Sequence, residues 1–175
     1  MNFSNTTNGN ATADVTVSLD KGRALTDIEA LLHVVGRRLA ATAEDSNRKY
    51  VQTPEEGVDR LLAARAMQQA LGEIRRTCAR YLRTGRTSDD NRLTDMKGTV
   101  VLKLRMPATW NFALTAPLTE AMHGAVVDYC AGRLLQASLP EEAATFAGSA
   151  QSRLRDIKGL LEKRTAPVRR PISRF

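Results

Sequence analysis

The segment from residue 98 to residue 136 changes its apolar periodicity at a proline, and this change constrains the fold more than any other feature. Before the proline, every second residue is apolar, which predicts a strand whose one apolar face is formed by Val100, Leu102, Leu104 and Met106. Pro107 ends that pattern, and a short loop containing Trp110 follows. The apolar spacing then becomes helical, at Leu118, Met122, Val126, Tyr129 and Leu134. The segment therefore predicts a strand followed closely by a long helix.

The composition favours a mainly α-helical protein. A chain of 175 residues is about the size of one domain and can bury a sizeable core without disulfides or metal. Aromatic residues make up only 5% of it, and its many alanines favour closely packed helices. No apolar run approaches the roughly 20 residues of a membrane span, and the first residues lack the pattern of a signal peptide. We therefore expect a cytoplasmic protein that enters no membrane.

Two stretches near the N-terminus predict a second strand and a first helix. Residues 14–20 alternate, with Val15, Val17 and Leu19 on one face, so they can pair with residues 100–106. Thr26 and Glu29 form a capping box, which predicts a helix that starts there and fades near Ala43. The apolar face of that helix is expected to be Ile28, Leu31, Leu32, Val35 and Leu39.

Two further helix starts are marked by prolines. The helix that opens at Thr53 and Pro54 is predicted to run toward Arg83 over about 30 residues, or about 45 Å. Its expected buried face is Leu61, Ala64, Leu71, Ile74, Cys78 and Tyr81. A last helix is predicted from Pro140, with Glu141 and Glu142 at the positive end of its dipole. Its apolar stripe is Ala143, Phe146, Ala147, Ala150, Leu154, Ile157 and Leu161.

These elements predict a bundle of about four helices with a small two-stranded β element and extended arms at both ends. We expect a flexible arm over residues 1–13, one domain over 14–162 and a basic tail rich in Pro and Arg over 163–175. Two short strands cannot easily bury the apolar face of residues 100–106. We therefore expect helices on one side of it and a neighbouring subunit near the corner formed by residues 106–110.

The sequence contains no recognisable catalytic constellation. His33 and His123 lie in separate predicted helices, and neither has a second ligand at a spacing that binds zinc. Cys78 and Cys130 fall on helical patterns and are expected to be packed, free thiols. The chain shows no phosphate-binding loop and no nucleophile motif. We therefore predict no catalytic residues, no cofactor and no metal.

Positive charge is the strongest functional signal. The chain carries a formal net charge of +7, and residues 151–175 hold eight cations against two carboxylates, a net of +6. A second basic group can face DNA, although a solvated helix face is the favoured interpretation of it. The group is Arg75, Arg76, Arg80 and Arg83. Trp110, the single tryptophan, can serve either the core or an interface.

Short motifs along the chain carry a family resemblance. They are residues 15–19 (VTVSL), 34–38 (VVGRR), 106–110 (MPATW), 139–143 (LPEEA) and 164–171 (RTAPVRRP). With the order of elements, they resemble the head–tail connector proteins, also called adaptor or neck proteins, of tailed bacteriophages and prophages, in their Bacteroidetes-type version. The resemblance covers most of the chain.

The resemblance implies a virion protein that assembles in the bacterial cytoplasm and has no enzymatic activity. Such connectors form a homo-oligomeric ring that docks on the portal, surrounds the DNA channel and receives a downstream tail or neck protein. The resemblance places subunit or portal contacts at Val100, Leu102, Leu104, Met106 and Trp110, and in the tail at Arg164, Arg169, Arg170, Ile172 and Phe175. The alternative is a basic accessory protein that binds nucleic acid without sequence preference.

Overall fold

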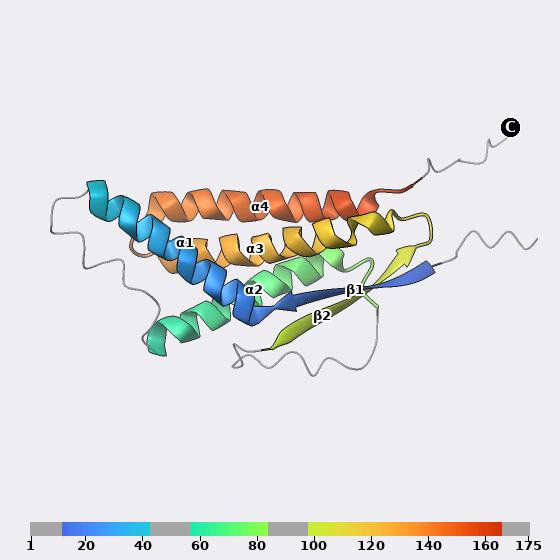
Figure 1. Ribbon diagram of the computed structural model, residues 1–175, viewed down its shortest axis with the longest axis horizontal. Coiled ribbons are helices and arrows are strands. Elements are labelled where there is room, and N and C mark those ends of the chain that lie inside the picture. Colours follow the sequence, from blue (N-terminus) through green and yellow to red (C-terminus); the bar gives the residue numbers. More distant parts are fainter. Residues whose placement is uncertain (1–11, 43–56, 84–97, 166–175) are drawn as a thin grey trace, which may run out of the picture.

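The computed structural model describes residues 12–42, 57–83 and 98–165, which form one mainly α-helical unit (Figure 1). In chain order the elements are β1 (Thr12–Asp20), α1 (Lys21–Thr42), α2 (Gly57–Cys78), β2 (Thr99–Pro107), the short 3-10 turn η3 (Phe112–Leu114), α3 (Thr115–Leu135) and α4 (Pro140–Glu162). The predicted fold class, four helices with a two-stranded β element, is thus confirmed for the described residues. Residues 1–11 of the predicted arm and residues 166–175 of the basic tail lie outside them, whereas Thr12 and Ala13 belong to β1.

The two strands form an antiparallel sheet, as their alternating patterns predicted. Val15 faces Leu104, and Leu19 faces Val100. This face is buried apart from the half-buried Ala13 at its end, whereas the opposite face carries exposed polar residues such as Thr16 and Lys103. Before β2, Gly98 adopts a φ of 105°, a conformation that favours glycine, and its carbonyl accepts a hydrogen bond from Lys21 N–H at 3.1 Å.

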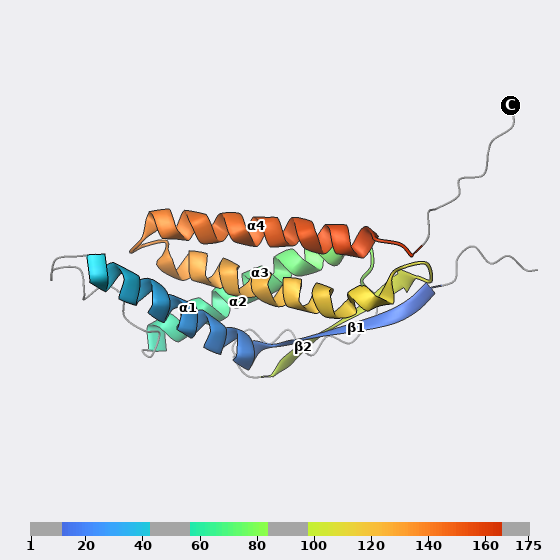
Figure 2. The same ribbon diagram turned by 45° about the horizontal axis from the view of Figure 1, so that its top comes forward.

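Helix α3 lies at the centre of the molecule and packs against α4, α2, α1 and β1. Figures 1 and 2 show α3 and α4 side by side along almost their whole length, with the sheet at one end. The close approach of these two helices depends on Gly132, since a Cβ there would lie 3.2 Å from the carbonyl oxygen of Ala143. Because neighbours surround it, α3 is buried on most sides, as a core helix is.

The buried face of β2 is covered by the chain itself, which corrects one prediction. Val100, Leu102, Leu104 and Met106 all belong to the core cluster together with residues of every helix. Met106 and Trp110 are both fully buried, so the corner expected to meet a neighbouring subunit is closed. The prediction underestimated how far α3 extends over a sheet of only two strands.

Helix α1 starts five residues earlier than its capping box predicted. Asp20, the last residue of β1, caps it: Oδ1 accepts hydrogen bonds from Gly22 N–H at 2.7 Å and Arg23 N–H at 3.2 Å. Thr26 instead lies within the helix, where its hydroxyl donates to the carbonyl of Gly22 at 3.1 Å. The predicted apolar face is otherwise correct, with Ile28, Leu32 and Val35 buried. The side chain of Leu39 lies outside the described set.

Helix α2 differs from its prediction at its end and in its buried face. Its described part has 22 residues and ends at Cys78, not near Arg83, while the predicted start at Thr53 and Pro54 lies outside the described residues. Leu61, expected in the core, is 58% exposed. Of the other predicted residues, Ala64, Ile74, Cys78 and Tyr81 are buried and Leu71 is half-buried. Further small residues and one methionine share this face, where α2 packs closely on α3: Ala63, Ala66, Met67 and Ala70.

Candidate functional site

The end of the sheet where Thr12 faces Pro107 holds a pocket of about 470 Å³. Four of its eight lining residues are arginines, namely Arg80, Arg83, Arg105 and Arg164. Thr12, Tyr81, Leu82 and Pro107 complete its wall. We call these four arginines with their wall the arginine pocket.

The four arginines of the arginine pocket come from three segments that are distant in sequence. After α2 ends, the chain runs beside β2: Leu82 pairs with Leu104, and Arg105 N–H donates to the carbonyl of Tyr81 at 2.6 Å. This pairing places Arg80 and Arg83 next to Arg105. Arg164 follows α4, and it is held there because its backbone forms a bridge with Trp110. The short strand-like run of residues 81–83 was not predicted, because the helical pattern continues through Tyr81.

The pocket carries an excess of positive charge. Arg83 contacts the carboxylate of Asp14 at 3.0 Å, and the Arg80 guanidinium lies 6.0 Å from the centre of the Tyr81 ring. Arg164 donates to the carbonyl of Leu161 at 3.0 Å. Among the described residues, the guanidinium of Arg105 has no hydrogen-bond or ion-pair partner. Four cations therefore meet one nearby carboxylate, an arrangement that binds anions.

The four arginines predicted to face DNA are divided between two places. Arg75 and Arg76 lie on α2, and Arg76 forms an ion pair with Glu73 at 3.2 Å. Arg80 and Arg83 lie beyond the helix and line the pocket. The expected single helix face is therefore wrong, because α2 ends at Cys78. Arg105 was not foreseen as their neighbour, since nothing in the sequence indicates the pairing that brings it there.

The predicted interface residues are mostly core residues. Trp110 is 0% exposed, and its indole Nε1–H donates to the carbonyl of Leu160 at 2.9 Å. Residues 163–165 close this corner, with Thr165 N–H donating to the carbonyl of Thr109 at 2.9 Å. Trp110 and the four predicted residues of the buried β2 face thus have no surface to offer another subunit. Of the predicted tail contacts only Arg164 is described; Arg169, Arg170, Ile172 and Phe175 lie outside the described residues.

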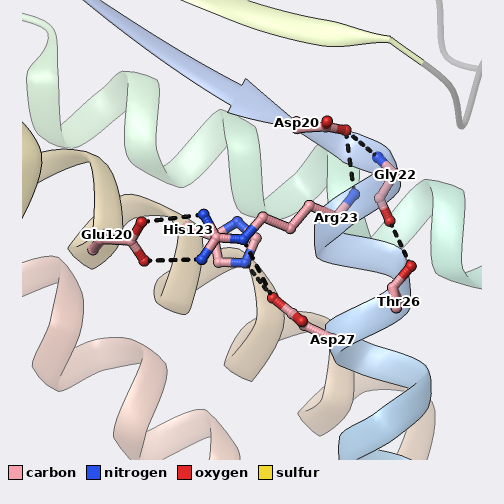
Figure 3. A network of polar contacts seen from close by, with 7 residues as sticks. All are labelled: Asp20, Gly22, Arg23, Thr26, Asp27, Glu120 and His123. Atoms are coloured by element: carbon pink, nitrogen blue, oxygen red, sulfur yellow. Dashed lines mark hydrogen bonds and ion pairs between the residues drawn. The ribbon is translucent and has the colours of Figure 1, made fainter.

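A second polar group joins α1 to α3 (Figure 3). His123 is buried, and its Nε2 lies 2.7 Å from Oδ2 of Asp27, while Arg23 reaches both carboxylate oxygens of Glu120. A histidine beside a carboxylate supplies two of the three members of a nucleophile-activating triad. Among the described residues, no hydroxyl or thiol bonds to His123. The contact between His123 and Asp27 joins α3 to α1. His33, by contrast, lies exposed on α1.

The remaining candidates for chemistry are packed. Cys78 and Cys130 are buried free thiols, as predicted, and burial raises the pKa of each to about 12. Glu141 and Glu142 lie in the first turn of α4, where Glu142 pairs with Arg38 of α1. Across the three described segments, no group of His, Cys, Asp and Glu is placed to hold a metal ion.

Comparison with known protein families, curated proteins and solved structures finds no match to this chain. In the described segments, no helix has both the length and the apolar content that a membrane crossing requires.

Proposed function

We propose that this protein is a non-enzymatic assembly protein of a phage virion, a ring-forming head–tail connector that docks on the portal. The observation that carries the proposal is the gathering of four arginines around one pocket, beside the point where the basic tail leaves α4. This end of the molecule therefore offers positive charge for docking a partner. The resemblance of the motifs described above supplies the identity of that partner.

The subunit contacts of the proposed ring must use surfaces other than the β2 face. A ring needs two different patches on each subunit, because its contacts run head to tail. The described residues expose four large apolar side chains: Val34 (60%), Leu61 (58%), Leu62 (44%) and Phe112 (43%). Leu61 and Leu62 are adjacent on α2, so they replace Leu102 and Met106 in our proposal as apolar subunit contacts.

The test of the connector role is co-purification with the portal protein from the same genome. We expect a discrete ring, either alone or assembled on the portal, when the complex is weighed by native mass spectrometry. Leu61→Glu with Leu62→Glu should prevent ring formation without unfolding the protein, because both side chains are exposed. A monomer that never binds the portal would contradict the proposal.

The alternative is a nucleic-acid-binding accessory protein, favoured by the number of arginines in the pocket and by the basic tail. It predicts DNA affinity that falls steeply with salt, because each phosphate contact releases counterions. Deletion of residues 166–175 separates the two proposals while keeping the contacts of residues 163–165. Loss of DNA affinity supports the accessory role. Loss of portal binding with unchanged DNA affinity supports the connector.

A further inference from the structure

We propose that the arginine pocket binds the carboxylates of an acidic peptide segment on a partner protein. The ligand is a short stretch of chain with two or three neighbouring Asp or Glu side chains. This inference deepens the docking role proposed above and rests on it, because it assigns that docking to one site.

The shape of the site favours a peptide over a nucleic-acid duplex. A pocket of about 470 Å³ falls within the size range of sites that bind compact ligands. Duplex DNA carries one charge per about 1.7 Å of its axis, and proteins that bind it distribute cations along an extended surface. Here Arg80, Arg83, Arg105 and Arg164 converge on one hollow. A single acidic side chain can enter that hollow, whereas a duplex can offer it little more than one phosphate.

The guanidinium chemistry fits carboxylates, and the structure contains one such contact. Arg83 Nη1 lies 3.0 Å from Oδ2 of Asp14, which shows that a carboxylate is accommodated beside the pocket. Arg105 has the planar fork that receives a carboxylate with two parallel hydrogen bonds. Four guanidinium groups less one carboxylate leave three positive charges, enough for two or three acidic side chains.

The apolar part of the wall adds selectivity for a peptide. Tyr81, Leu82 and Pro107 line the pocket together with the arginines. The methylene groups of a Glu side chain can pack against these surfaces, whereas inorganic phosphate gains nothing from them. A peptide should therefore bind more tightly than a free anion of similar charge.

The backbone around the arginines is already fixed, which lowers the entropy lost on binding. Arg83 N–H donates to the carbonyl of Lys103 at 2.9 Å, and Arg105 N–H to that of Tyr81 at 2.6 Å. The side chain of Arg164 is tied to the carbonyl of Leu161 at 3.0 Å. Only the ends of the side chains have to adjust to the ligand.

The experiment measures binding of a fluorescein-labelled hexaglutamate peptide to the full-length protein by fluorescence anisotropy. Salt is kept at about 150 mM, where exposed charges are screened beyond about 8 Å. Arg105→Gln should weaken binding about tenfold, the loss expected for one charge-assisted pair. Arg105→Lys keeps the charge but not the fork, so its affinity for the peptide should lie between that of the wild type and that of Arg105→Gln. Arg37→Gln, an exposed arginine of α1, is the matched control and should change affinity less than about twofold.

Three results would overturn the inference. Equal losses of peptide affinity for Arg37→Gln and Arg105→Gln would show that only the net charge of the protein matters. Tighter binding of a labelled DNA duplex than of the peptide, with the same response to Arg105→Gln, would assign the pocket to nucleic acid. Inorganic phosphate that displaces the peptide with equal affinity would reduce the site to a simple anion site. Circular dichroism of each variant confirms that it is folded.

The inference and the connector role fail separately. If Arg80→Gln with Arg105→Gln binds the portal as well as the wild type does, the pocket is not the docking site, although the connector role stands. If the wild type binds the peptide through Arg105 but never the portal, the pocket inference survives and the connector role does not.

Discussion

Asp128 is an acidic residue in the interior between α3 and α4, and the sequence did not reveal it. Its side chain is only 8% exposed, and Oδ2 accepts hydrogen bonds from Ser149 Oγ at 2.6 Å and Arg153 Nε at 2.7 Å. A buried carboxylate is tolerated when such partners satisfy it. The helical pattern shows apolar stripes but cannot show a polar residue whose partners come from another helix.

The two partners of this ion pair should not be equally sensitive to substitution. Arg153→Met leaves the buried carboxylate without its cation, so we expect it to lower the free energy of unfolding by about 2–3 kcal/mol. Asp128→Asn leaves Arg153, which is 43% exposed and can turn toward water, so its cost should be nearer 1 kcal/mol. Urea unfolding measures both. The control is Arg155→Met at an exposed position of the same helix, which should change the free energy of unfolding by less than about 0.5 kcal/mol. A larger loss of stability for Asp128→Asn than for Arg153→Met would contradict the burial of the Asp128 carboxylate.

The buried thiols predict a loss of stability in alkali. Burial raises the pKa of Cys78 and Cys130 from 9.0 to about 12, since desolvation disfavours the thiolate. Between these values the unfolded chain loses protons that the folded protein keeps. The free energy of unfolding should therefore fall as the pH rises above 9.0, by up to about 1.4 kcal/mol per pH unit for each thiol.

Urea unfolding at several alkaline pH values checks this slope. Cys78→Ala with Cys130→Ala keeps the lysines and tyrosines that titrate in the same range, so it isolates the part due to the thiols. The slope of the variant should be shallower than that of the wild type. Equal slopes would mean that the thiols are accessible to water in the folded protein.

At the scale of single elements, the periodicity of the apolar residues predicted well which strands and helices exist, but it predicted poorly where they end. The period of two predicted both strands and their pairing, and the helical spacing predicted α3 and α4. The capping box at Thr26 was misleading, because Asp20 also offers a capping carboxylate and is the last residue of the strand. Local signals of similar strength compete, and the packing of β1 against β2 decides between them.

The two candidate helix starts can be compared directly. Asp20→Ala removes the acceptor for two N–H groups in the first turn of α1 and should cost about 1 kcal/mol of unfolding free energy. Thr26→Ala removes a hydroxyl inside the helix, bonded only to a carbonyl that the helix also uses, and should change stability by less than about 0.5 kcal/mol. Chemical denaturation gives both values, and the opposite order would place the helix start at Thr26.

At the scale of the whole molecule, residues at one end of the sheet hold distant parts of the chain together. Trp110 follows β2, its indole bonds the last turn of α4, and its backbone pairs with Arg164. The same contacts position one wall of the arginine pocket. The end of the sheet thus couples the core to the candidate binding site.

Trp110→Phe tests this coupling. It leaves the carbonyl of Leu160 without its indole donor and a gap in the core, so the free energy of unfolding should fall by about 2–3 kcal/mol. Trypsin should also cleave faster after Lys163 and Arg164, because their backbone contacts with the 109–111 loop are weakened. Unchanged cleavage and stability would show that the corner does not hold the start of the tail.

The amino-acid sequence by itself determined the class of fold, the two strands, the apolar face of α1, that of α4 apart from the exposed Ala147, and the buried state of both cysteines. These follow from local periodicity and residue size, which act over a few neighbouring positions. The tertiary structure alone decided that the β2 face and Trp110 are covered by the same chain, and that Arg80, Arg83, Arg105 and Arg164 meet at one pocket. Both depend on where the chain leaves a helix and what it then packs against, and contacts between distant segments set that.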